Sequence, residues 1–309
     1  RKSTGTVACT LFDSPDGFYT NSRQRGAEWE RETSVEYFDP NGDMTGFQLN
    51  CGIRAHGELA RHPDKNPKRP LRLLFKGEYG PSKLNYSLFG ETDVSQWDTI
   101  VLRATYGNSW ISGRDNADYI RNPFSHAMLR DLGQVASEST VAHLYINGVY
   151  WGLYNPEERP DDSFSAEHFG GDKAEWDVIK GLIVDQRWEL ASGRSDAWET
   201  LWNMLPNFTG PADPAYTLSD TEYATLLQYV DIENFIDYMI VHMYVNAYAW
   251  PQKNWYTTCR RDVDNPAGPP VEKFRWFSWD MENNMGWHEQ DRTTVGDNSG
   301  DNYGPGRLH

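Results

Sequence analysis

The sequence has few cysteines, no long hydrophobic run and a shortage of basic residues. Its three cysteines, Cys9, Cys51 and Cys259, form neither a C-x-x-C pair nor a zinc-ligand spacing. A Cys9–Cys51 disulfide is one option, and three partly buried free thiols are the simpler interpretation. No apolar stretch approaches the ~18 residues that cross a bilayer, so we expect no membrane span.

Basic residues are too few for a general nucleic-acid-binding protein. The chain has 29 Lys and Arg against 45 Asp and Glu, which gives a formal net charge of −16. Nucleic-acid binding needs a basic footprint, so we expect no nucleic-acid partner. A phosphate-bearing ligand would need a local basic patch or a metal ion. The chain also lacks a G-x-x-x-x-G-K-[ST] loop and a G-x-S-x-G elbow, which argues against a P-loop ATPase and a Ser-His-Asp hydrolase.

What the sequence does contain is aromatic residues, at 14% of its 309 residues, including thirteen Trp. These carry enough area for a solid core despite the polar average. Together with the negative charge, they favour an extracellular or cell-surface location. The chain begins at Arg1 without a methionine and ends in the loop-like "GDNSGDNYGPGRLH", so we interpret it as a piece of a larger protein, truncated at its C-terminal end.

The first half of the chain is predicted to be mostly β. Strand-like runs cover residues 34–38, 46–57, 69–80 and 98–104, and residues 140–155 form a hairpin around Asn147-Gly148. A helix is predicted over residues 119–132, closed by Gly133.

The second half is predicted to be more helical. Ser219 and Glu222 form a capping box for a helix over residues 221–229, and Asp231 caps the next helix. In that second helix an apolar stripe is predicted to be the buried face: Ile232, Phe235, Ile236, Met239, Ile240 and Met243. The chain is therefore predicted to have an α+β fold, with a β-rich part over residues 1–115 and a mixed part over residues 116–309.

A hairpin near the end of the chain is predicted to bring two polar residues together. Its strands cover residues 255–261 and 272–280, so Asn254 and Asp280 lie at the ends that meet. An amide oxygen and a carboxylate suit a hard cation such as Mg²⁺. Taken singly, each residue is better explained by a turn or a cap. Together they favour a divalent-metal site.

Four motifs resemble the CotH kinase family of atypical protein kinases. They are "GIRAHGELARHPDKNPKRPLRLLFKGEYG", "LYINGVYWGLYNPEERPD", "NAYAWPQKNWY" and "FRWFSWDME", which occur in the family's order between Gly52 and Glu282. The resemblance implies a two-lobed kinase-like fold that uses ATP with Mg²⁺ or Mn²⁺. It also implies phosphate transfer to Ser or Thr of a protein substrate, with autophosphorylation as one outcome.

The resemblance also implies roles for individual residues. Asp280 and Asn254 would hold the metal. Lys68 and Arg72 would face the phosphates, with Arg54 placed similarly and Glu158 as the partner of Lys68. Two aromatic residues, Tyr154 and Phe274, are candidates to flank adenine. For both rings core packing is the simpler interpretation, and for Glu158 a surface charge is as good an explanation.

Ala249 departs from the family pattern. It lies five positions before Asn254, where a kinase loop of the form H-R-D-x-x-x-x-N has its aspartate. A methyl group cannot accept a proton, and loss of a positioned base costs ~10²–10⁴ in rate. We therefore expect this form to be inactive or impaired, either as a natural pseudokinase or because the aspartate was replaced.

Two other classes of protein remain open. A non-catalytic carbohydrate-binding or adhesion module would suit the many Trp residues and the acidic surface, and it would show no Mg²⁺-dependent ATP binding. A glycoside hydrolase would use Asp280 and Glu282. Such pairs need ~5–9 Å between opposed carboxyl groups, which close neighbours at one strand end rarely provide.

Overall fold

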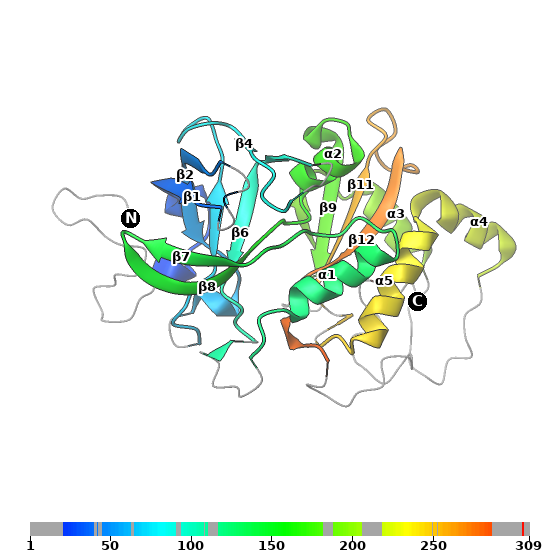
Figure 1. Cartoon of the computed structure of the whole chain (residues 1–309). Helices are drawn as coiled ribbons and strands as arrows, with labels where there is room; N and C mark the ends of the chain where they lie inside the picture. Colours follow the sequence, from blue (N-terminus) through cyan, green and yellow to red (C-terminus); the bar gives the residue numbers. More distant parts are fainter. Residues whose placement is uncertain are drawn as a thin grey trace. The chain divides into compact units, whose positions relative to one another are not determined.

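The structure is a computed structural model of the chain (Figure 1). It describes residues 21–39, 42, 45–62, 65–90, 94–107, 109–110, 117–181, 188–205, 218–248, 250–251, 253–285 and 305. No helix within these ranges is long and apolar enough to cross a membrane. The mixture of antiparallel sheets and helices confirms the predicted α+β class.

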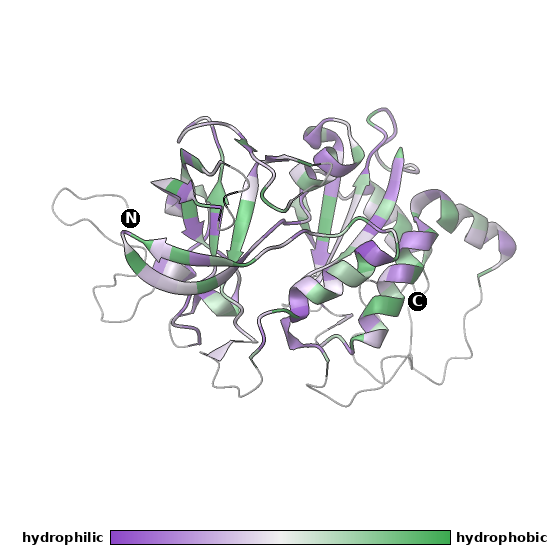
Figure 2. Ribbon diagram, viewed as in Figure 1, coloured by the Kyte–Doolittle hydropathy of each residue, from purple (hydrophilic) through white to green (hydrophobic). Residues whose placement is uncertain are grey.

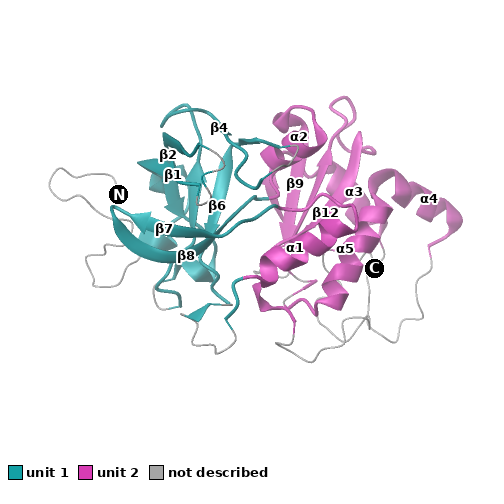
Figure 3. Cartoon of the chain, viewed as in Figure 1, with its two compact units in different colours: residues 1–119, 138–159 teal, residues 120–137, 160–309 magenta. Residues whose placement is uncertain are grey.

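The chain divides into two compact units (Figure 3). Unit 1 comprises residues 1–119 and 138–159, and unit 2 comprises residues 120–137 and 160–309. The predicted division near residue 115 put the hairpin after residue 140 in the second part. The structure instead groups that hairpin with unit 1, because its second strand pairs with a strand of the first sheet. The two-lobed kinase-like arrangement stays a prediction.

Unit 1 is built on a six-stranded antiparallel sheet with the order β1-β2-β3-β6-β8-β7. The strands are β1 (Arg31–Tyr37), β2 (Phe47–Ala55), β3 (Leu71–Leu74), β6 (Thr99–Arg103), β7 (Ala142–Ile146) and β8 (Val149–Glu157). Two short strands, β4 (Leu84–Asn85) and β5 (Gln96–Trp97), pair separately. Short 3-10 turns cover Asn21–Arg23, Ala27–Trp29 and Leu59–Arg61. The central strand β6 is hydrophobic along most of its length (Figure 2).

The two faces of this sheet differ in chemistry. Because side chains alternate along a strand, Leu71, Leu73, Ile100 and Leu102 lie on one face, where they form a core with Cys51 and other residues. The opposite face carries arginines, which are described below. Cys51 and Cys259 are buried free thiols, as expected, and Cys9 lies outside the described residues.

The hairpin prediction at Asn147-Gly148 is confirmed. Both residues have positive φ, 50° and 76°, which a two-residue type I′ turn requires and which Asn and Gly tolerate. The predicted strand over residues 69–80 is shorter, because the chain turns at Lys76, whose carbonyl accepts the N–H groups of Tyr79 and Gly80. Helix α1 (Arg121–Asp131) ends as predicted, with Gly133 at φ 87° just beyond it.

Unit 2 is built on a four-stranded antiparallel sheet with the order β10-β9-β11-β12. Its strands are β9 (Trp176–Gly181), β10 (Trp188–Ser192), β11 (Trp255–Arg260) and β12 (Glu272–Ser278). The helices are α1, α2 (Asp162–Phe169), α3 (Asp196–Met204), α4 (Asp220–Tyr229) and α5 (Ile232–Tyr244), with 3-10 turns at Lys173–Glu175 and Met281–Asn283. The capping box of Ser219 and Glu222 and the Asp231 cap are both present.

Helices cover both faces of the unit 2 sheet. Ile179, Trp255, Phe274 and Trp276 point to one face, where they form a core with residues of α1, α3, α4 and α5. Val178, Tyr256 and Phe277 point to the other face and pack with Phe164 and Phe169 of α2. A sheet buried on both faces holds its register tightly, which matters for the residues at its ends.

The predicted buried face of α5 was partly wrong. Phe235 and Met239 are buried at 5% exposure each, but Ile236 and Ile240 are 49% and 52% exposed. Besides Phe235 and Met239, the helix buries four residues outside the predicted stripe, Asn234, Tyr238, Val241 and His242. The reason is Asn234, whose amide accepts from the N–H of Trp276 and donates to its carbonyl, at 2.7 and 3.4 Å. Because the side chain of Asn234 has to face β12 to form these two hydrogen bonds, the helix is turned so that Asn234 and its neighbours on the same side are buried.

This rotation predicts a large difference between two neighbouring residues of α5. Met239→Ala should lower the free energy of unfolding by about 2–5 kcal/mol, because it opens a cavity in the core. Ile240→Ala should change it by about 0.5 kcal/mol or less, because the side chain is half exposed. Urea unfolding of both variants measures the difference. Equal losses would support the stripe predicted from sequence.

Candidate active site

Asn254 and Asp280 lie together at one end of the β11–β12 hairpin. Trp255 pairs with Ser278 in the ladder, and beyond this pair the N–H of Trp279 donates to the Asn254 carbonyl at 3.3 Å. The Asn254 side chain reaches across, and its Nδ2 donates to the Asp280 carbonyl at 3.3 Å. Residues far apart in the sequence are therefore joined by direct contacts.

The side-chain amide of Asn254 has a defined orientation. Its Nδ2 also donates to the carbonyl of Tyr248 at 3.5 Å. Both partners are acceptors, so the opposite orientation would set two oxygens against each other. The Oδ1 atom of Asn254 therefore points away from these carbonyls. An amide oxygen and a carboxylate, such as that of the exposed Asp280, are the types of ligand that Mg²⁺ or Mn²⁺ prefers.

Both residues adopt the left-handed backbone conformation, with φ 66° at Asn254 and 59° at Asp280. Asn and Asp adopt it more readily than other non-glycine residues. Within the described part of the chain, no group of three or more His, Cys, Asp or Glu could hold a metal. A metal here would therefore be completed by water or by the phosphates of a ligand.

The loop before Asn254 is anchored to α5. The indole N–H of Trp250 donates to the Tyr238 hydroxyl at 2.8 Å, and the Trp250 ring lies 5.1 Å from that of His242. The N–H of Ala247 donates to the His242 carbonyl at 3.0 Å. Ala249 itself lies outside the described residues, whereas Tyr248 and Trp250 are described.

In unit 1, arginines gather on the sheet face opposite the core. Arg54 of β2 pairs directly with Arg72 of β3, which pairs with Val101 of β6, and Val101 pairs with Glu157 of β8. Arg103 follows Val101 by two residues and so lies on the same face. Like charges directly opposite each other repel, so this arrangement favours an anionic partner. We call the residues Arg54, Arg72 and Arg103 the arginine face.

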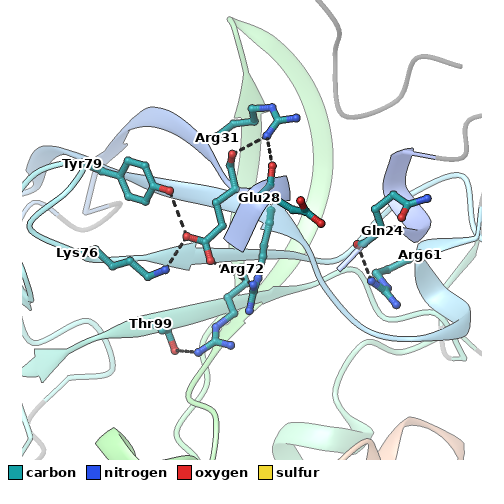
Figure 4. A network of polar contacts seen from close by, with 10 residues as sticks. Gln24, Glu28, Arg31, Arg61, Arg72, Lys76, Tyr79 and Thr99 are labelled. Atoms are coloured by element: carbon teal, nitrogen blue, oxygen red, sulfur yellow. Dashed lines mark hydrogen bonds and ion pairs between the residues drawn. The ribbon is translucent and has the colours of Figure 1, made fainter. Parts of the chain in front are cut away.

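A buried carboxylate, Glu30, supplies one anionic partner. Its side chain is 1% exposed and accepts from Arg54 at 3.1 Å and from Lys76 at 2.6 Å. The Tyr79 hydroxyl also donates to it at 3.2 Å. Figure 4 shows Lys76 and Tyr79 approaching this carboxylate, with Arg72 donating to Thr99 nearby. Sequence reasoning missed both residues: Glu30 lies outside the four motifs, and Lys76 lies within the first of them without a spacing that marks its role.

The pKa of His56 is affected by the positive charge of this region. The pKa of His56 is well below its ordinary value, first because of burial and then because of four arginines. They are Arg159, Arg72, Arg103 and Arg54. In a chain of net charge −16, this cluster of arginines is a local exception, although Arg54 and Arg103 are also paired with Glu30 and Glu157.

Lys68 and Glu158 are held by different groups. The Lys68 ammonium donates to the Leu153 carbonyl and lies 4.3 Å from the centre of the Tyr154 ring. Burial lowers its pKa to about 8. The Glu158 carboxylate, in a side chain that is 2% exposed, accepts the N–H of Glu138 at 2.7 Å. Glu158 is therefore not a surface charge, and the Lys68–Glu158 pairing stays a prediction.

The two candidate adenine-flanking rings lie in hydrophobic cores. Tyr154 is 1% exposed within the unit 1 core, and its hydroxyl donates to the Arg69 carbonyl at 2.9 Å. Phe274 is fully buried against Trp198, with ring centres 5.5 Å apart. Because neither ring is accessible to a ligand in this structure, core packing explains both residues.

Comparison with known protein families places the chain in a kinase family. Residues 53–307 match the family described as CotH kinase protein. This match covers most of the 309 residues, so the chain belongs to the CotH kinase family, as its motifs indicated. No curated protein matches the chain significantly.

The contact between His242 and Trp250 makes the anchoring of the loop sensitive to pH. Burial lowers the pKa of His242 to about 3, so the folded protein holds it neutral while the unfolded chain protonates it below about pH 6.5. Stability from this group is present above pH 6.5 and is lost as the pH falls toward 3. When the pH is lowered from 6.5 to 4.5, the free energy of unfolding of His242→Gln should fall by about 2–3 kcal/mol less than that of the unchanged chain. Chemical unfolding at both pH values measures this, and parallel losses would show that His242 is not the titrating group.

Proposed function

We propose that the chain is a kinase-type phosphotransferase that binds ATP with a divalent metal and is impaired in the transfer step. The observation that carries the proposal is the meeting of Asn254 and Asp280 at one hairpin end in a chain of the CotH kinase family. The acceptor that we propose is a Ser or Thr hydroxyl of a protein, including this chain itself. An extracellular or cell-surface setting is part of the same proposal.

Asn254 and Asp280 would hold the metal through the amide Oδ1 and the carboxylate. When bound, Mg²⁺ or Mn²⁺ neutralises charge on the phosphates that it contacts. The hydrogen bonds from Nδ2 to Tyr248 and Asp280 keep the Asn254 oxygen directed away from those carbonyls. Such preorganisation lowers the cost of assembling a site.

The arginine face would bind phosphate oxygens. Arg54 forms an ion pair with Glu30, and a guanidinium can form paired hydrogen bonds to phosphate oxygens. We propose that Arg72, directly opposite Arg54, is the principal contact. Lys68 is a weaker candidate, because its ammonium is already held by the Leu153 carbonyl.

Position 249 would limit transfer. An incoming hydroxyl has to be oriented and lose its proton, and the methyl group of Ala249 can do neither. Binding does not need this base. The proposal therefore separates two properties: nucleotide binding is retained, and phosphoryl transfer is weak or absent.

Nucleotide binding is tested by thermal-shift and calorimetric titration with ATP, with and without Mg²⁺ or Mn²⁺. We expect stabilisation that depends on the metal, because a ligand bound to the native state raises its stability. Asp280→Ala should abolish the metal-dependent part. Arg72→Ala should weaken ATP binding by roughly ten- to a hundredfold, the effect of a lost charge-assisted hydrogen bond.

A matched control is Arg25→Ala, which removes a cation of unit 1 that forms an exposed pair with Glu58. Its ATP affinity should stay within about twofold of the unchanged chain, since exposed ion pairs contribute little. No metal-dependent binding by the unchanged chain would refute the proposal and favour a non-catalytic binding module. Equal losses from Arg25→Ala and Arg72→Ala would remove the arginine face from the site.

The transfer step is tested by restoring the missing acid. Ala249→Asp should raise phosphoryl transfer by the ~10²–10⁴ expected of a positioned base, while ATP affinity changes less. Incorporation of radiolabelled phosphate into the chain and into a generic protein acceptor is compared at equal ATP occupancy. Equal, measurable rates from both forms would show that position 249 does not house the base.

A further inference from the structure

The peptide unit between Asp280 and Met281 is held at both of its ends. Its carbonyl, from Asp280, accepts from Nδ2 of Asn254 at 3.3 Å. Its N–H, from Met281, donates to Oδ1 of Asn122 at 2.8 Å. The carbonyl and N–H of a trans peptide point in opposite directions, so two asparagine side chains fix the plane of this peptide from opposite sides.

Asn122 reaches this peptide from the first turn of α1, which lies beside the segment after β12 (Figure 1). Its side chain is in a closed environment, since Asn122 is 4% exposed and Met281 is 2% exposed. Two further residues of α1 hold the segment farther along. Arg121 donates to the Asn284 carbonyl at 3.1 Å, and the Ser125 hydroxyl accepts from the Asn284 side chain at 2.6 Å.

The orientation of this peptide decides where the Asp280 carboxylate points. Asp280 has φ 59° and ψ 43°, a conformation that L-residues adopt only at a cost. The ψ angle is the rotation that places the peptide held by the two asparagines. A buried N–H left without its acceptor would favour a different ψ angle, and the Asp280 side chain would move with it.

We propose that Asn122 is a positioning residue for the metal-binding Asp280. It touches neither nucleotide nor metal, and it acts by holding the Asp280–Met281 peptide in the plane that the left-handed conformation requires. The inference rests on the proposed function, because it assumes that Asp280 binds the metal. It adds a residue from α1, an element outside the hairpin, to the determinants of metal affinity.

The test compares Asn122→Ala with Asn122→Asp and Ser125→Ala. Metal affinity is read from Mn²⁺ titrations at fixed ATP, and the exchange rate of the Met281 amide is read by hydrogen exchange in the ligand-free chain. Asn122→Ala should raise the half-saturating Mn²⁺ concentration about tenfold, the equivalent of one hydrogen bond of about 1.4 kcal/mol. It should also speed exchange at Met281. Asn122→Asp keeps an acceptor oxygen and should recover most of both properties.

Ser125→Ala distinguishes positioning from general support. It removes an equally buried contact at Asn284, three residues beyond Met281. It should lower the melting temperature and leave both the Mn²⁺ constant and the Met281 exchange rate within about twofold. Equal effects of Asn122→Ala and Ser125→Ala on the Mn²⁺ constant, or an unchanged constant in Asn122→Ala, would overturn the inference alone. No metal binding by the unchanged chain would refute the proposed function instead.

Discussion

The register between β11 and β12 is the constraint on which the candidate active site depends. Pairing of Trp255 with Ser278 sets Asn254 beside Asp280. A slip of one residue would also exchange the two buried faces of β12, moving Trp276 out of one core and Phe277 out of the other. The aromatic packing on both sides of the sheet therefore secures a polar contact at its end. The stability of the sheet and the arrangement of the candidate site therefore depend on the same ladder.

Alternation along strands has a different result in unit 1. There one face of the sheet is a hydrophobic core, and the other places Arg54 opposite Arg72. Glu30 relieves the repulsion between them by its ion pair with Arg54, and it also binds Lys76. The oxygens of a polyphosphate could bind the same cations as the Glu30 carboxylate, because guanidinium and ammonium groups bind carboxylates and phosphates alike.

Local signals in the sequence predicted local structure well. The Asn147-Gly148 turn, the Ser219 capping box and the Asp231 cap each depend on side chains within a few residues of the backbone that they satisfy. The contact between Asn254 and Asp280 could also be predicted, because a hairpin joins its own ends. What could not be predicted depends on distant partners. The apolar residues of α5 allow more than one stripe, and Asn234 selects one by bonding to Trp276 of β12. The roles of Glu30 and Asn122 similarly arise from contacts across 24 and 159 residues.

The acidity of the chain does not conflict with binding of a polyanion. At physiological ionic strength charges beyond about 8 Å are largely screened, so most of the net charge of −16 has little effect at any one site. The groups that decide phosphate affinity are those within that distance. Four arginines act on His56, and the carboxylate of Asp280 would be offset by a bound metal. Net charge therefore describes how the whole surface behaves toward extended polyanions such as nucleic acids, whereas a small ligand responds to the local arrangement that the strand registers create.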